Sequence, residues 1–363
     1  MDAKTTGGIN RVLIYRLGSL GDTIVALPSF HLIARAFPQA ERILLTNLSV
    51  NSKASPISEI LKNSGLVQGY VSYPLKLRNL KELLKLSLRI RKWAPEVLVY
   101  LAEPRGTARV IRDALFFKLS GVKCLVGVPY SKEQQENYWI SEAQGFEPEA
   151  ARLARCLSPI GKIDLDDRQS WDLVLTPEEE QRAHAVLASW PGRDRFIAGS
   201  VGTKVDLKNW GEKNWAELLA RFSARRQEYG LLLIGAAAEA ALSERLSRHW
   251  SGPKLNLCGQ LSPRLSAAVL RQAVMFVGHD SGPIHLAACA GVPAVGIFSA
   301  RNKPGVWFPY GTKHRIIYHK TECSGCKLEV CEEHEHKCIR TITVDEVFEA
   351  MEQILGKRDN IVN

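Results

Sequence analysis

Short apolar runs recur along the whole chain and alternate with longer amphipathic stretches. Runs without polar alternation are typical of strands that are covered on both faces. We expect ten such runs to form strands, at residues 12–15, 42–46, 97–101, 123–128, 171–175, 195–199, 231–235, 254–257, 274–277 and 293–298. Helical stretches separate most of them, and this alternation predicts parallel sheets with helices on both faces.

The pattern is interrupted by a polar stretch between Gly161 and Thr176. A chain of 363 residues also exceeds the size of a typical single core, so two domains are expected. We place an α/β domain at residues 1–168 and a second at 169–343. A final segment, 344–363, opens with a helix.

One polar turn, Gly278–His285, joins a predicted strand to a helix of small residues. Free backbone N–H groups at a helix N-terminus bind anions. Gly282 lets a phosphate approach the backbone closely, and Pro283 suits a first helical position because no N–H is needed there. Asp280 can accept a hydrogen bond from a sugar or ribose hydroxyl. The alternative is an ordinary strand-to-helix connection in which Asp280 only caps the helix.

A second glycine turn follows the first predicted strand. Gly18 and Gly21 form a tight loop, and Asp22 opens the next helix. The spacing is Gly-x-x-Gly rather than Gly-x-Gly-x-x-Gly, so it does not favour dinucleotide binding. Reacting groups collect at the carboxyl edge of a parallel sheet. Asp22 is therefore either a helix cap or a catalytic base.

Together the two turns resemble glycosyltransferase family 9, which includes the ADP-heptose:lipopolysaccharide heptosyltransferases. The resemblance lies in Leu17-Gly-Ser-Leu-Gly-Asp22 and Asp280-Ser-Gly-Pro-Ile-His285, and it continues at Gly202-Thr203, Lys208-Asn209-Trp210 and Glu239. It implies the GT-B architecture, in which two Rossmann-like parallel-sheet domains face a central cleft. The N-terminal domain would bind the acceptor and the C-terminal domain the nucleotide-sugar donor, and the last helix would pack back on the N-terminal domain.

The resemblance also implies the reaction: inverting transfer of a sugar, heptose from ADP-heptose in the first instance, to a hydroxyl of lipopolysaccharide or another cell-surface glycan. Asp22 would be the general base, and Lys208 and the helix N-terminus would stabilise the leaving pyrophosphate without a metal ion. The expected donor-binding residues are Gly202, Thr203, Lys208, Glu239, Asp280, Ser281, Gly282, Pro283 and His285. The expected acceptor-binding residues are Gly18, Gly21, Arg105 and Arg109.

Several positions depart from the family pattern, among them Ser281 in place of Thr and Pro283-Ile284 in place of Leu-Ser before His285. Two further departures bear on the donor. Asn209 stands where many members have Arg, and His279 stands where heptosyltransferases commonly carry a small or apolar residue. Both leave the sugar donor open, so another nucleotide sugar or a protein acceptor stays an alternative. A nucleotide-sugar epimerase would need acid–base groups from both halves, and a non-catalytic metal-binding nucleotide sensor would not need Asp22.

The formal net charge of +10 is unevenly distributed. Seven basic residues and one acidic residue lie between Lys76 and Lys92, interspersed with leucines. An amphipathic basic helix can lie on an anionic membrane surface, and the alternative is a helix with a solvated basic face. We expect peripheral contact with the inner membrane surface for a lipid-linked acceptor. Nucleic acid is not expected as a partner, because no aromatic and basic recognition motif accompanies the charge.

Apolar stretches in the chain stay shorter than the roughly 20 residues that a membrane-spanning helix needs. The polar residues Met1–Gly8 also differ from the apolar region of a signal peptide. The protein is therefore expected to be cytoplasmic.

Four cysteines are concentrated in the loop 323–338, namely Cys323, Cys326, Cys331 and Cys338. In a cytoplasmic chain they meet the ligand count of a tetrahedral site for zinc or iron. The resemblance gives this cluster a structural role, and no cofactor is expected for catalysis. The alternative is reduced or disulfide-paired cysteines. The scattered Cys124, Cys156, Cys258 and Cys289 are expected to be buried free thiols.

Overall fold

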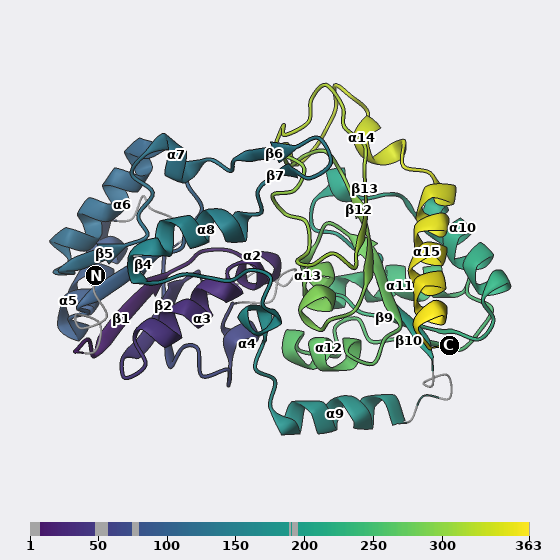
Figure 1. The fold of residues 1–363 in the computed structure, drawn as a ribbon, viewed down its shortest axis with the longest axis horizontal. Coiled ribbons are helices and arrows are strands. Elements are labelled where there is room, and N and C mark those ends of the chain that lie inside the picture. Colours follow the sequence, from purple (N-terminus) through teal and green to yellow (C-terminus); the bar gives the residue numbers. More distant parts are fainter. Residues whose placement is uncertain (1–7, 48–56, 75–79, 189, 191–194, 363) are drawn as a thin grey trace. The chain divides into compact units, whose positions relative to one another are not determined.

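The computed structural model describes residues 8–47, 57–74, 80–188, 190 and 195–362, with side chains up to residue 356. The chain forms two compact units (Figure 1). The N-terminal unit holds the described residues up to Val174 except the short segment Glu142–Gly145, and the C-terminal unit holds that segment and the chain from Leu175 onward. Each unit is built around its own parallel sheet.

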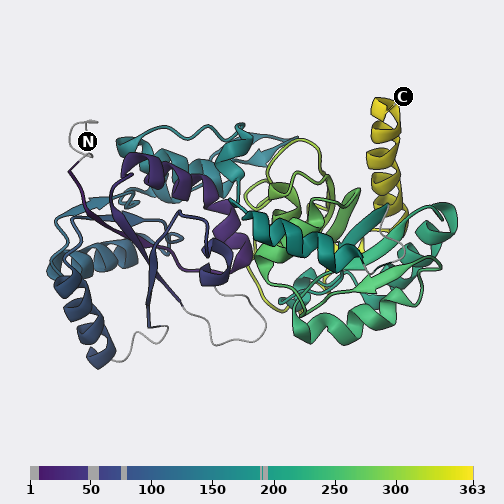
Figure 2. The ribbon, with the colours of Figure 1, turned by 90° about the horizontal axis from the view of Figure 1, so that it is seen from below.

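The sheet of the N-terminal unit has five parallel strands in the order β3-β2-β1-β4-β5. Its strands are β1 (Arg11–Tyr15), β2 (Glu41–Thr46), β3 (Gly69–Ser72), β4 (Val97–Tyr100) and β5 (Cys124–Val126). The helices are α2 (Leu20–Val25), α3 (Leu27–Ala36), α4 (Ile57–Leu61), α5 (Leu80–Trp93), α6 (Thr107–Leu119), α7 (Lys132–Gln135) and α8 (Glu149–Leu157). Short 3₁₀ turns lie at Ser158–Ile160 and Arg168–Trp171, and β6 (Trp139–Ser141) pairs with β7 (Gly145–Phe146). Helices cover both faces of the five-stranded sheet, with α3 on one side and α5 and α6 on the other (Figure 2).

The sheet of the C-terminal unit has six parallel strands in the order β10-β9-β8-β11-β12-β13. Its strands are β8 (Phe196–Ser200), β9 (Gly230–Leu233), β10 (Lys254–Asn256), β11 (Met275–His279), β12 (Ala294–Phe298) and β13 (Arg315–Tyr318). The helices are α9 (Pro177–Ala188), α10 (Glu212–Arg225), α11 (Ala240–Ser247), α12 (Pro263–Leu270), α13 (Gly282–Cys289), α14 (Lys337–Arg340) and α15 (Val344–Val362), with 3₁₀ turns at Asp206–Lys208 and Ala237–Glu239.

The last helix, α15, packs within the C-terminal unit. It contacts α10 and the strands β11, β12 and β13. Val347, Met351 and Leu355 are buried in the core that this unit builds around Trp210 and Trp215. The expected return of α15 to the N-terminal half stays a prediction.

The prediction of an α/β fold with two parallel sheets is confirmed, and nine of the ten predicted strands are present. The strand predicted at 171–175 is wrong: the chain ends a 3₁₀ turn at Trp171 and continues without a partner strand. Trp171 and Leu173 are nevertheless buried, which explains the strand-like pattern. The edge strands β3 and β13 were not predicted, because each has only four residues and no buried apolar run.

The part of the chain that the structure describes contains no helix long and apolar enough to cross a membrane.

Candidate functional site

In the C-terminal unit, the predicted residues lie on three loops at the carboxyl ends of the adjacent strands β9, β8 and β11. These loops, called here the carboxyl-edge loops, are Gly202–Lys208, Gly235–Glu239 and Asp280–His285. From β8 the chain adds β9 and β10 on one side of the sheet, and it then returns to the other side of β8 to add β11, β12 and β13. The strand order therefore reverses between β8 and β11. Open α/β sheets bind ligands at such a reversal of strand order.

An ion pair between the partly buried Lys208 and the buried Asp280 joins the first and third of these loops. The ammonium Nζ of Lys208 lies 2.7 Å from Oδ2 of Asp280 and donates to the Asp280 carbonyl at 2.9 Å. The amide of Asn302 also donates to Oδ2 of Asp280, at 3.3 Å. Lys208 is thereby fixed beside the turn that leads into α13, and its contact with a phosphate stays a prediction. One oxygen of Asp280 is already occupied by these donors.

The N-terminus of α13 lacks a side-chain cap. Ser281 occupies the N-cap position, but its hydroxyl donates to the His279 carbonyl at 3.3 Å instead of accepting from the helix. Gly282 and Pro283 form the first turn, and His285 is buried within the helix. The alternative in which Asp280 caps the helix is wrong, because the cap position belongs to Ser281. The first turn of α13 can thus offer its N–H groups to an anion.

The carboxylate of Glu239 occupies space that two glycines leave open. A Cβ atom on Gly202 would lie 2.2 Å from Oε1 of Glu239, and one on Gly235 would lie 2.4 Å from its Oε2. Oε2 accepts a hydrogen bond from the Ala236 N–H at 2.8 Å. Burial raises the pKa of Glu239. The carboxylate is held between the ends of β8 and β9, next to the loop of Thr203.

His279 is completely buried below the carboxyl-edge loops. Its Nε2 accepts the backbone N–H of Trp210 and the indole N–H of Trp215, both at 3.2 Å. Nδ1 must then carry the proton, and it lies 3.3 Å from the carbonyl of Gly202. Burial lowers the pKa of His279 to about 4. The sequence suggested that this residue affects donor identity, whereas in the structure it supports the loops from the core.

In the N-terminal unit, Asp22 is the third residue of α2 and takes part in its cap. Oδ2 of Asp22 accepts hydrogen bonds from the backbone N–H and the hydroxyl of Ser19, at 2.7 and 2.9 Å. Gly18 has a φ of +147°, and a Cβ there would lie 2.5 Å from Cβ of Asp22. Gly18 therefore serves a compact loop that fixes Asp22, whereas Gly21 is the second residue of α2. Contact of either glycine with an acceptor stays a prediction.

Two residues that support this loop were not predicted from the sequence. Arg16 is buried, and its guanidinium donates to the carbonyls of Leu101 at 2.5 Å and Asp22 at 2.7 Å. The side-chain oxygen of Asn47 accepts the N–H of Gly18 at 2.9 Å. The position of Arg16, a charged residue directly after the apolar strand β1, was the signal in the sequence that could have identified it.

The two arginines expected to bind the acceptor occupy different surroundings. Arg105 is half-buried, and its guanidinium lies 3.2 Å from the Tyr15 hydroxyl and 3.4 Å from Oδ2 of Asp113. The hydroxyl of Tyr100 donates to the same Asp113 oxygen at 3.2 Å. Arg105 thus belongs to a network at the carboxyl ends of β1 and β4. Arg109 is exposed on α6.

The four clustered cysteines lie near one another as free thiols, so the disulfide alternative is wrong. Cys331 and Cys338 are buried beside Leu207 and Ala300. Burial and then the neighbouring thiols raise the pKa of Cys338. Among the residues that the structure describes, no three His, Cys, Asp or Glu side chains are arranged to hold a metal ion.

Three of the four scattered cysteines are buried as expected, and Cys124 is half-buried.

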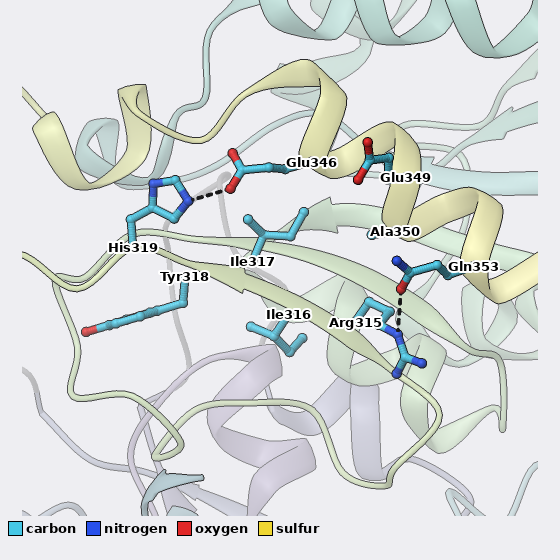
Figure 3. A pocket seen from close by; sticks show the side chains of 9 residues that line it. All are labelled: Arg315, Ile316, Ile317, Tyr318, His319, Glu346, Glu349, Ala350 and Gln353. Carbon is cyan, nitrogen blue, oxygen red and sulfur yellow. Dashed lines mark hydrogen bonds and ion pairs between the residues drawn. The ribbon is translucent and has the colours of Figure 1, made fainter. Parts of the chain in front are cut away.

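A pocket of about 360 Å³ lies between β13 and α15 (Figure 3). Across it, His319 contacts Glu346 at 2.8 Å and Arg315 donates to Gln353 at 3.3 Å. None of the predicted donor-binding residues lines this pocket.

Comparison with known proteins supports the family resemblance. Residues 140–337, more than half of the chain, match the family model of glycosyltransferase family 9 (heptosyltransferase). The lipooligosaccharide heptosyltransferase 2 of Campylobacter jejuni is 25% identical over 154 residues, which make up 41% of this chain and 47% of that protein. The match thus spans about half the length of this curated relative.

Solved structures share the fold. A glycosyl transferase of family 9 from Veillonella parvula superposes with a TM-score of 0.72 at 15% identity, covering 96% of this chain and 98% of that one. The ADP-heptose lipopolysaccharide heptosyltransferase II of E. coli gives a TM-score of 0.66 at 16% identity, covering 96% and 99%. The two parallel sheets therefore match those of heptosyltransferases with the GT-B fold. This chain belongs to glycosyltransferase family 9.

Proposed function

We propose that the protein is an inverting glycosyltransferase that moves heptose from ADP-heptose to a hydroxyl of a lipopolysaccharide or related glycan. The observation that carries the proposal is the pairing of Lys208 with Asp280 directly beside the uncapped N-terminus of α13. The cation and the N–H groups of the helix lie together at the edge of the sheet where the strand order reverses, and such groups can bind a pyrophosphate. The curated relative and the E. coli neighbour are both heptosyltransferases, which favours heptose as the sugar.

In this mechanism the C-terminal unit binds the donor. The leaving ADP gains negative charge as the sugar–phosphate bond breaks, and Lys208 and the first turn of α13 stabilise that charge. The carboxylate of Glu239 accepts a hydrogen bond from a ribose hydroxyl. Gly202 and Thr203 provide a further phosphate contact. Because a cation and a helix terminus supply this stabilisation, the reaction needs no metal ion.

We assign the general base to Asp22. Ser19 holds Oδ2 of Asp22 with two hydrogen bonds, and Oδ1 takes the proton of the acceptor hydroxyl. The acceptor oxygen then attacks the anomeric carbon from the face opposite ADP, so one displacement inverts the configuration. Arg16 and Asn47 position this carboxylate through the backbone of its loop.

For the cysteine loop we propose a structural zinc or iron ion. Four neighbouring thiols have the chemistry for such an ion, but the described residues do not form a ligand set as they stand. The loop would therefore have to close around the metal, and no catalytic step depends on it.

The donor assignment is tested by thermal unfolding of the purified protein with ADP, ADP-heptose, UDP, GDP and their sugars. A ligand that binds only the folded state raises the melting temperature. We expect the largest shift with ADP and ADP-heptose. A shift confined to the uridine or guanosine nucleotides would replace the donor while keeping the transferase, and the absence of any shift would contradict the phosphate-binding site itself.

A further inference from the structure

The outward sides of α5 and α6 carry large aliphatic side chains in contact with solvent. On α5 these side chains are Leu80, Leu84 and Leu88, which are 80%, 61% and 55% exposed. On α6 they are Ile111, Leu115 and Leu119, which are 52%, 57% and 64% exposed. Residues four apart lie on one side of a helix, so each helix presents an apolar stripe to solvent. These six residues are called the leucine face.

Both helices belong to the same layer of the N-terminal unit. Leu86 of α5 and Val110 and Phe117 of α6 are buried in one core cluster against the five-stranded sheet. The hydroxyl of Ser120, next to α6, donates to the hydroxyl of Ser87 on α5 at 2.9 Å. Figures 1 and 2 show the two helices next to each other in this unit. The two apolar stripes are thus on the outer side of a single helical layer.

Basic residues accompany the leucine face. The two helices contain eight Lys and Arg residues and two acidic residues. Glu82 pairs with Lys85, and Asp113 is buried against Arg112. Each acid neutralises one cation, so eight basic and two acidic residues leave the two helices with a net formal charge of +6. On α5 the exposed cationic side chains are Lys81, Lys85, Arg89, Arg91 and Lys92. Lys76 and Arg78, which also belong to the predicted basic segment, lie outside the described residues.

The grouping of these side chains indicates a binding surface. Thirteen large hydrophobic side chains are exposed among the described residues, and six of them form the leucine face. Exposed apolar residues are ordinarily scattered, whereas a gathered set marks an interaction site. A second copy of the chain packed on the same surface would bring its own positive charges against these. An anionic bilayer complements both the leucines and the cations.

We propose that the outer sides of α5 and α6 dock the protein on an anionic bilayer. The leucine face enters the boundary between headgroups and acyl chains, and the flanking Lys and Arg side chains contact lipid phosphates. This surface belongs to the N-terminal unit, whereas the carboxyl-edge loops belong to the C-terminal unit. Binding of the surface to a bilayer requires no nucleotide. It would keep the enzyme at the interface where a lipid-linked acceptor is found.

The test is co-sedimentation with vesicles of phosphatidylcholine alone or of phosphatidylcholine with phosphatidylglycerol. We expect binding to the anionic vesicles that weakens as salt is added. The triple variant Leu84→Gln, Leu88→Gln, Leu115→Gln should bind the anionic vesicles at least about tenfold more weakly, because the inserted apolar surface is lost. The matched control is Leu328→Gln, Val330→Gln, which changes two exposed apolar residues of the C-terminal unit and should bind as the wild type does.

Each variant is also melted with and without ADP. An unchanged ADP-induced shift shows that the fold and the nucleotide site are intact, so failure of docking is distinguished from failure of the proposed function. The proposal is overturned if the wild type does not sediment with anionic vesicles, or if the triple variant and its control bind these vesicles equally. A dimer in lipid-free solution that the triple variant abolishes would also overturn it, by assigning the leucine face to a second copy.

Discussion

At the scale of single residues, His279 joins two segments through its two ring nitrogens. It contacts the segment of Trp210 on one side and the loop of Gly202 on the other. These hydrogen bonds need a neutral ring with the proton on Nδ1, and burial favours the neutral form by lowering the pKa to about 4.

The stability of the protein should therefore depend on pH through His279. An unfolded histidine has a pKa of about 6.5. Between that pH and about 4, His279 is protonated in the unfolded chain and neutral in the folded one. We expect His279 to lower the free energy of unfolding by about 3 kcal/mol as the pH falls from about 6.5 to about 4. Urea unfolding across this range measures it.

The controls are His279→Gln, which should remove that part of the pH dependence, and His249→Gln at an exposed histidine, which should keep it. Parallel stability curves for the wild type and His279→Gln would contradict this account of the buried ring.

Lys208 offers a second prediction at this scale. Removing it leaves the buried carboxylate of Asp280 without its cation, so Lys208→Met should destabilise the protein by about 3 kcal/mol or more. The surface pair of Lys85 and Glu82 is the comparison, since both side chains are largely exposed. Lys85→Met should cost less than about 1 kcal/mol. If urea unfolding gave the same loss in free energy of unfolding for both variants, the Lys208–Asp280 pair would contribute no more than an exposed ion pair.

At the scale of elements, the carboxyl-edge loops depend on glycines that leave room for Glu239. Gly202→Ala would place a Cβ within 2.2 Å of the carboxylate, which must then move. We expect ADP to bind at least about tenfold more weakly and the free energy of unfolding to fall by about 1–3 kcal/mol. Gly356→Ala, where nothing lies within 4 Å, is the matched control. It should leave ADP binding unchanged, and calorimetric titration compares the two.

Elements with long apolar runs could be predicted from the sequence, and so could the loops that follow them. Parallel topology then places the Gly202, Glu239 and Asp280 loops at one edge, because their strands β8, β9 and β11 are neighbours. The sequence could not predict contacts that depend on side-chain direction. The inward orientation of His279 and the occupation of Asp280 by Lys208 are of this kind. The edge strand β13 was missed because pairing on one side needs no buried apolar run.

At the scale of the whole molecule, the cysteine loop belongs to the C-terminal unit, and a metal there would link Cys323 and Cys326 to the buried Cys331 and Cys338. Elemental analysis of the purified protein should find about one zinc or iron ion per chain. Replacing Cys331 and Cys338 with Ser should remove the ion and lower the melting temperature, whereas Cys156→Ser should keep it. A metal-free wild type with an unchanged melting temperature in chelator would contradict the proposal.

The central proposal is sugar transfer with Asp22 as the general base. The most direct measurement incubates the protein with ADP-heptose and a heptose-deficient lipooligosaccharide and analyses the products by mass spectrometry and NMR. We expect ADP release together with one added heptose of inverted anomeric configuration. Asp22→Asn should slow transfer by about 10²–10⁴-fold while ADP affinity is unchanged. Equal transfer by the wild type and Asp22→Asn, or an epimerised donor without transfer, would contradict the account.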